Sequence, residues 1–140
     1  MNIINTFIAR TIKPCLFIFG LVTCTILPIA VDIRFLTPIL GGVVDYTPSS
    51  APALRHWGFV VFGIGVLMVV ASFRPWLRFE TMLLCTAEKA FVAYLFLSSL
   101  GQPGINGYLP AVLVDSTIAA YGVLYFISDQ GRPQRWKATG

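Results

Sequence analysis

Charged residues are scarce in this chain, and the shortage excludes most soluble classes of protein. Only 11% of its 140 residues are Asp, Glu, Lys or Arg, whereas 56% are hydrophobic and the mean hydropathy is +0.79. Soluble domains usually carry about 25% charged residues. The composition therefore indicates one membrane-embedded domain.

Histidine and cysteine are also scarce. The chain has one histidine, His56, and three cysteines, none of them in a CxxC pair. We therefore expect no paired-histidine haem site, no zinc site and no disulfide framework. A Gly-rich phosphate loop, a Glu-x-x-His pattern, a nucleophile with a neighbouring base and a nucleic-acid-binding motif are all missing from the sequence. We expect no cofactor, no nucleic-acid partner and no catalysis by this chain alone.

Long apolar runs are what the chain has instead. They occupy residues 15–31, 57–73, 79–100 and 109–128. A helix over 79–100 would be roughly 33 Å long, which matches a hydrocarbon core of about 30 Å. We predict an all-α fold: a single domain over residues 1–140 in which four transmembrane helices form an antiparallel bundle. Pro28 cannot donate a backbone hydrogen bond to the Cys24 carbonyl, so the first helix should bend there.

The first apolar run has two interpretations. Residues 1–13, with Arg10 and Lys13, precede it as in a signal peptide. The run is longer than the apolar part of most signal peptides, and no small-x-small cleavage site follows it. Cys24 has the outline of a lipoprotein cleavage site, but Thr23 is a poor residue before the cysteine. We expect an uncleaved helix without a lipid anchor.

Residues 32–56 form the predicted outer loop. Pro38, Pro52 and the pair Gly41-Gly42 forbid a continuous helix through it. Residues 35–44 within it are apolar but too few to span a membrane. This segment is either interfacial or re-entrant, or a loop that lies on the outer end of the bundle.

Small residues mark two faces where helices should pack closely. Gly58 and Gly65 are seven residues apart on one face of the second predicted helix, and Ser116 and Ala120 form a small-xxx-small pair on the fourth. Such positions let a neighbouring backbone approach in a membrane bundle.

Lysine and arginine are distributed unequally between the two sides of the predicted bundle. Arg10, Lys13, Arg74, Arg78, Arg132, Arg135 and Lys137 flank one side, and only Arg34 and Arg55 lie in the other two loops. Because loops rich in Lys and Arg remain cytoplasmic, both termini, including a basic tail at residues 129–140, are predicted in the cytoplasm of a bacterial inner membrane. The net charge of +4 is then mostly a topology signal that also favours anionic headgroups of the lipid bilayer.

Three ionisable residues fall inside the predicted spans: Glu88 and Lys89 in the third, and Asp115 in the fourth. Each costs about 2.5–3.5 kcal/mol on insertion scales, so they should face protein and not lipid. Glu88 and Lys89 are consecutive in a helix and are expected not to pair with each other, whereas Lys89 can reach Asp115. Glu88 would then be an uncompensated charge that holds a proton or finds another partner.

The charged set has two interpretations that the sequence leaves open. It is either a protonatable site or polar pocket for a headgroup, a quinone or an ion, or a buried ion pair that fixes helix register, with Glu88 hydrogen-bonded to Ser or Thr. His56 is a fourth candidate, as a ligand or proton relay, but it is also ordinary for a membrane-surface position beside Trp57.

Several short strings give the chain a family resemblance. Leu54-Arg55-His56-Trp57-Gly58, Phe73-Arg74-Pro75 and Glu88-Lys89-Ala90-Phe91, followed by Asp115, resemble in layout the small bacterial four-helix membrane proteins of the DoxX-like kind. The resemblance covers residues 15–128 and implies the four-helix fold. Some DoxX-like proteins are subunits beside redox enzymes that use quinone.

Two functional hypotheses follow. The leading one is a non-catalytic accessory subunit of a larger membrane-protein partner, or a binder of a lipid-like small molecule such as a quinone. The alternative is a small proton- or ion-coupled carrier that works as a homo-oligomer, because a chain of this size would need self-association to build a transport path.

Overall fold

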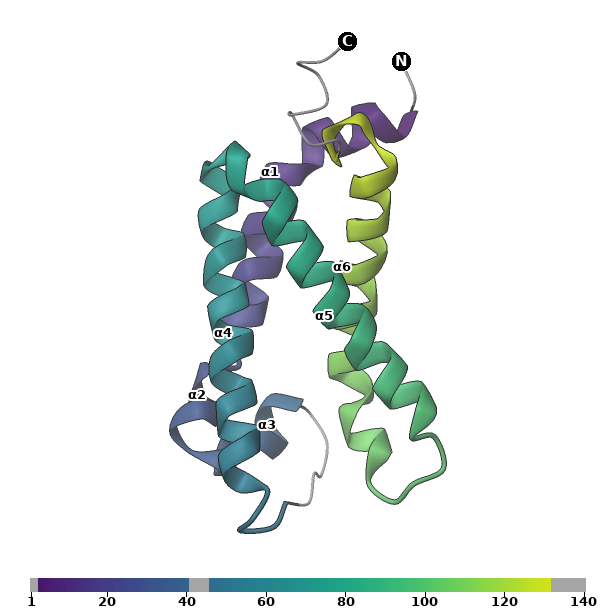
Figure 1. Ribbon diagram of the computed structural model, residues 1–140. Coiled ribbons are helices and arrows are strands. Elements are labelled where there is room, and N and C mark those ends of the chain that lie inside the picture. Colours follow the sequence, from purple (N-terminus) through teal and green to yellow (C-terminus); the bar gives the residue numbers. More distant parts are fainter. Residues whose placement is uncertain (1–2, 41–45, 132–140) are drawn as a thin grey trace.

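The computed structural model of the protein describes residues 3–40 and 46–131, and all regular structure in those ranges is helical (Figure 1). The α-helices are α1 (Ile3–Cys24), α2 (Leu27–Val31), α3 (Leu36–Leu40), α4 (Ala51–Phe73), α5 (Arg78–Ser98) and α6 (Leu109–Ile127). Short 3₁₀ turns lie at Ile33–Phe35, Pro75–Leu77, Ile105–Tyr108 and Asp129–Gly131.

Four helical stretches are long and apolar enough to cross a membrane: Ile3–Val31, Ala51–Phe73, Pro75–Ser98 and Ile105–Ile127. Their outer faces carry exposed apolar side chains, among them Phe59, Phe91 and Leu113. Water would disfavour so much exposed apolar surface, whereas lipid chains would cover it. The predicted all-α class and the four apolar helices are confirmed, and the composition is that of a multi-pass membrane protein.

The first helix is longer than the apolar run that predicted it. It begins at Ile3, well before residue 15, because Ile8, Ile12 and Leu16 recur at every fourth position and are buried. Pro14 lies inside α1, where it cannot donate to the preceding turn. Figure 1 shows α1 beginning beside the end of α6 and crossing the top of the molecule toward α4, before the helix continues down beside α4.

Hydrogen bonds join the beginning of α1 to the turn that follows α6. The backbone N–H of Asp129 donates to Asn5 Oδ1 at 3.0 Å, and Asn5 Nδ2 donates to the Asp129 carboxylate. The start of α1 and the end of α6 therefore lie at the same end of the molecule. We call this the terminal end, and the opposite end, which carries α2 and α3, the α3 end.

The chain between α1 and α4 is more helical than predicted. The expected bend near Pro28 is present as a break, since α1 stops at Cys24 and α2 starts at Leu27. The predicted loop at residues 32–56 contains α3 and the first turns of α4. Residues 41–45 of that loop, and residues 132–140 of the predicted tail, lie outside the described ranges.

The short helix α3 is built into the α3 end. Leu36 is fully buried in an apolar cluster with Ile29 and Val61, and α3 also contacts α6. Within the apolar segment 35–44, Leu36 thus packs inside the bundle, whereas Phe35 is exposed.

The helices associate mainly as two pairs, α1 with α4 and α5 with α6. A Cβ atom added at Gly65 would lie 2.8 Å from Cys24 Sγ, and one added at Gly58 would lie 3.2 Å from the Ala30 nitrogen. The predicted close-packing face of Gly58 and Gly65 is therefore confirmed, with α1 and α2 as the neighbours.

The predicted close-packing face on α6 is wrong. Ser116 and Ala120 are exposed, and the close approach to α5 occurs at Gly122, where an added Cβ would overlap Thr86 Oγ1. The inward face of α6 is instead the one that carries Asp115, Ile118 and Gly122.

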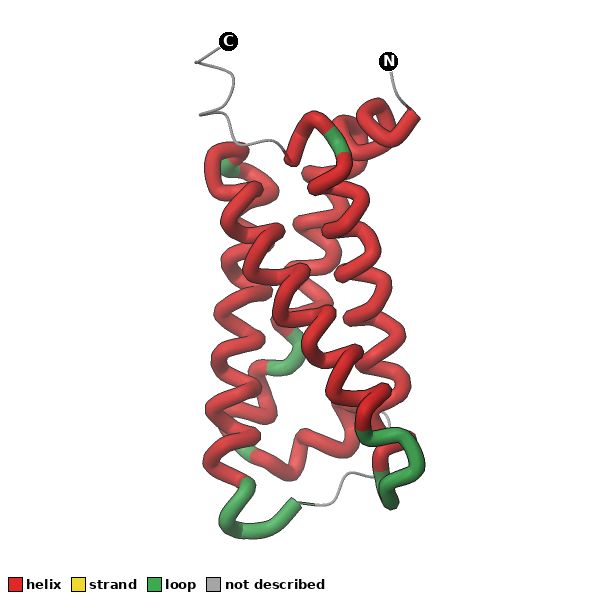
Figure 2. Tube along the Cα trace, turned by 45° about the vertical axis from the view of Figure 1, so that its right-hand side comes forward, coloured by secondary structure: helices red, strands yellow, loops and turns green. Residues whose placement is uncertain are grey.

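Two apolar clusters divide the interior. The cluster at the terminal end includes buried residues from all four long helices, such as Leu16, Met68, Met82 and Tyr121. The cluster at the α3 end contains no residue of α5. Figures 1 and 2 both show why: α5 crosses the bundle at an angle, beside α4 at the terminal end and beside α6 at the α3 end.

Candidate functional site

Lys89 is the buried centre of a charged cluster formed with Glu88 and Asp115. Its Nζ atom lies 3.0 Å from Asp115 Oδ1 and 3.1 Å from Glu88 Oε2. The Lys89 side chain is 4% exposed, and those of Asp115 and Glu88 are 13% and 19% exposed. The expected contact between Lys89 and Asp115 is present. The expectation that Lys89 does not pair with Glu88 is wrong, because a long lysine side chain can fold back to its neighbour.

The periodicity of two helices brings these residues together. On α5, Cys85 and Lys89 are buried one turn apart, and on α6 Val112 and Asp115 lie three residues apart. Residues spaced by three or four share one face of a helix. The facing stripes of α5 and α6 therefore bring the Lys89 ammonium group to Asp115, and Glu88 joins the cluster as the neighbour of Lys89 on α5.

The cluster carries an unbalanced charge when all three groups are ionised. Two carboxylates and one ammonium group sum to one negative charge. Glu88 Oε1 has no hydrogen-bonding partner among the described residues, so the expected bond from a Ser or Thr hydroxyl is not made there. An isolated charge in a low-dielectric interior is costly unless it is compensated. The cluster is short of one positive charge.

A cavity of about 200 Å³ reaches the cluster. Lys89 and Asp115 line it, together with Thr23, Thr25 and apolar or aromatic side chains from α1, the break between α1 and α2, α3, α4, α5 and α6. Glu88 is not among the lining residues. The two carboxylates are therefore not equivalent: Asp115 borders the cavity, and Glu88 does not.

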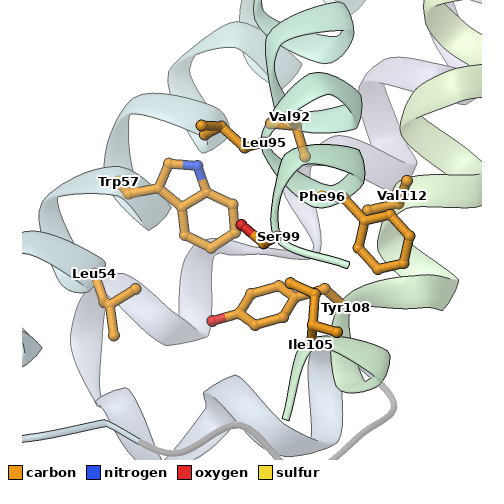
Figure 3. A pocket seen from close by; sticks show the side chains of 9 residues that line it. All are labelled: Leu54, Trp57, Val92, Leu95, Phe96, Ser99, Ile105, Tyr108 and Val112. Carbon is orange, nitrogen blue, oxygen red and sulfur yellow. The ribbon is translucent and has the colours of Figure 1, made fainter. Parts of the chain in front are cut away.

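A second, apolar cavity of about 320 Å³ adjoins the first toward the α3 end (Figure 3). Its walls are formed by Leu54, Trp57, Val92, Leu95, Phe96, Ser99, Ile105, Tyr108 and Val112. Trp57, Val92, Tyr108 and Val112 also line the first cavity, so the two spaces share walls. Figure 3 shows the side chains of Trp57 and Tyr108 extending into the space between α4 and the α5–α6 pair.

Both cavities reach the lateral surface of the bundle. Leu95, in the wall of the larger cavity, is 46% exposed, and Val22 and Val114, in the wall of the smaller one, are 44% and 42% exposed. Together the two spaces fall in the size range of small-molecule sites. A molecule dissolved in the bilayer can enter from the side, with its apolar part in the larger cavity and its polar part at Lys89 and Asp115.

His56 does not belong to this arrangement. Its side chain is exposed near the start of α4, and it lines neither cavity. Among the described residues no group of three or more His, Cys, Asp or Glu side chains is placed to hold a metal ion. The structure thus joins three of the four residues singled out from the sequence, and leaves His56 apart.

The cavity walls are the part of the site that sequence reasoning missed. Lys89, Val92 and Phe96 recur on one face of α5, Ser99 follows the last residue of that helix, and all four line a cavity. The sequence contains this stripe, but an apolar stripe next to a charged residue also fits a packed bundle interior. Only the positions of the neighbouring helices show that it lines a cavity.

Comparisons with known proteins add no assignment. No protein-family model matches the chain, and searches of the curated proteins and of the solved structures also returned no match.

Proposed function

We propose that this protein is a non-catalytic, multi-pass protein of a bacterial inner membrane that binds a lipid-like small molecule inside its helix bundle. The observation that carries the proposal is the pair of adjoining cavities, which join an apolar chamber to a buried charged cluster. A site with mostly apolar walls and a few convergent polar groups is typical of small-molecule binding.

The proposed topology is an antiparallel four-helix bundle with both termini in the cytoplasm. Support comes from the Lys and Arg asymmetry and from the hydrogen bonds that bring Asn5 and Asp129 together at the terminal end. Arg74 and Arg78 lie in or beside the turn between α4 and α5, which belongs to the same side. In this orientation the cavities lie in the outer half of the membrane.

Accessory-subunit function is compatible with this site and remains part of the proposal. The layout resemblance to DoxX-like proteins, some of which stand beside quinone-using enzymes, favours a larger membrane-protein partner. Exposed apolar side chains on α5, such as Phe91 and Leu97, offer a surface for such a partner as well as for lipid.

The alternative function is a proton- or ion-coupled carrier acting as a homo-oligomer. The unbalanced charge of the cluster favours it, because two carboxylates that share one ammonium group can take up a proton or a cation during a transport cycle.

Purification in a mild detergent, followed by native mass spectrometry and lipid extraction, tests these functions. We expect the purified protein to carry a lipid-like molecule. Val92 lies in the wall shared by both cavities, so the larger side chain in Val92→Trp should fill part of the cavities and release that molecule. Leu113→Trp, on the exposed face of α6, is the matched control and should retain it. A homo-oligomer without a bound molecule would favour the carrier, and a larger protein in fixed ratio would identify an accessory subunit.

A further inference from the structure

We propose that the cavities select an amphiphilic organic cation, such as an alkylammonium compound, over neutral or anionic molecules of the same apolar size. The inference rests on the proposed function and names the chemical class of its ligand. Two independent observations support it: the charge of the cluster and the aromatic walls.

The net charge of the cluster determines whether a positively or a negatively charged headgroup is favoured. With Glu88, Lys89 and Asp115 ionised, the sum is one negative charge, and a monovalent cation at Asp115 makes the site neutral. An anionic headgroup would raise the imbalance to two negative charges in a low-dielectric space. Like charges at such close range are disfavoured, whereas an opposite charge is attracted.

Lys89 does not block the cation, because it has a second partner. Its ammonium group already contacts both carboxylates at nearly equal distances, 3.0 Å to Asp115 and 3.1 Å to Glu88. When a cation takes Asp115, Lys89 stays paired with Glu88, which lies outside the cavity wall. The site thus changes from a shared lysine to two separate ion pairs, without leaving a charge unpaired.

The aromatic walls favour a cation with bulky apolar substituents. Trp57 and Tyr108 line both cavities. The faces of aromatic rings attract quaternary ammonium groups, and the attraction grows where water is excluded. The apolar chain of the ligand would extend past these rings into the larger cavity, toward Phe96 and Ile105 (Figure 3).

The test compares three probes that share one alkyl chain: dodecyltrimethylammonium, dodecanol and dodecanoate. Their binding to the full-length protein in lipid nanodiscs is measured by equilibrium dialysis and corrected for empty nanodiscs. We expect the cation to bind about tenfold or more tightly than dodecanol, and dodecanoate to bind least. Equal binding of the cation and dodecanol would overturn the cation proposal but leave the lipid-like binder intact. If none of the probes binds above the empty nanodiscs, the proposed function fails as well.

Two variants distinguish the effect of the cluster's net charge on cation binding from the effect of direct contact with the cation. Asp115→Asn removes the carboxylate in the wall, and Glu88→Gln neutralises the cluster without touching the wall. Both should lower cation binding to the level of dodecanol. Glu80→Gln, at an exposed position of the same helix, is the control and should bind the cation as the wild type does. Wild-type cation binding by Glu88→Gln would refute the role of net charge.

The cation can come from a free amphiphile or from the amine headgroup of a phospholipid. Nanodiscs of phosphatidylglycerol, with and without phosphatidylethanolamine, distinguish these sources. Loss of probe binding in the presence of phosphatidylethanolamine identifies the lipid amine as the cation, and unchanged probe binding identifies a free cation.

Discussion

Replacing Lys89 with methionine should destabilise the protein more than any other single change in the charged cluster. The substitution keeps an unbranched apolar side chain but removes the ammonium group that lies 3.0 Å from Asp115 and 3.1 Å from Glu88. Two carboxylates then face each other with no cation between them. Removing one partner of a buried pair costs about 3–5 kcal/mol, so Lys89→Met should lower the free energy of unfolding by about that amount.

The shared lysine predicts an asymmetry between the variants. Asp115→Asn leaves Lys89 paired with Glu88, so its cost should be that of one lost charged hydrogen bond, about 1.5–3 kcal/mol. The triple variant Lys89→Met, Glu88→Gln, Asp115→Asn removes all three charges together and should recover much of the stability lost in Lys89→Met. Among these residues, Lys89 alone contacts both of the others.

Reversible unfolding in mixed micelles, followed by the helical circular dichroism signal, measures these differences. Glu80→Gln is the control, since the side chain is exposed, and its effect should stay within about 0.5 kcal/mol. If Asp115→Asn costs as much as Lys89→Met, the Glu88 contact contributes no stability and the shared-lysine reasoning is refuted.

Three further predictions concern topology, packing and the terminal end. A reporter fused after Gly140 should read as cytoplasmic and one inserted at Ser50 as external, and a cytoplasmic signal at Ser50 would overturn the four-span topology. Gly122→Ala should destabilise by about 1–3 kcal/mol in the same unfolding assay, because its Cβ would overlap a threonine side chain of α5; Gly63→Ala, where nothing lies within 4 Å, should cost nothing or stabilise slightly, and equal losses would contradict the packing described. Asn5→Ala removes both hydrogen bonds to the turn after α6 and should speed hydrogen exchange in the first turns of α1; unchanged exchange would show that these bonds do not hold the helix.

The apolar runs predicted the four long helices because hydropathy over some twenty residues depends only on local sequence. They did not predict where α1 begins, since Arg10 and Lys13 lower the local hydropathy while the periodic Ile8 and Ile12 still bury one face of a helix. Helix ends depend on packing and backbone hydrogen bonds that hydropathy does not measure.

The charged cluster was predictable only in part. Counting the rise along the two helices left a gap in depth between Lys89 and Asp115 that a long lysine side chain can close, and the structure has that contact. The contact with Glu88 was missed because the angle between consecutive residues describes Cβ directions and not the reach of a lysine side chain. The cavities were missed for a different reason: they depend on the angle at which α5 crosses the bundle, and no local pattern encodes that angle.

The division of the interior into two apolar clusters has a consequence for how the protein is made. The cluster at the terminal end needs Ile8 and Leu16 from the first helix to be synthesised and Tyr121 and Tyr125 from the last. This cluster can therefore close only after α6 has been synthesised. Until then α1 has only α4 as an extensive partner, and the hairpin of α5 and α6 must insert and dock afterwards. Docking of the α5–α6 pair therefore completes the burial of the face of α1 that carries Ile8, Ile12 and Leu16.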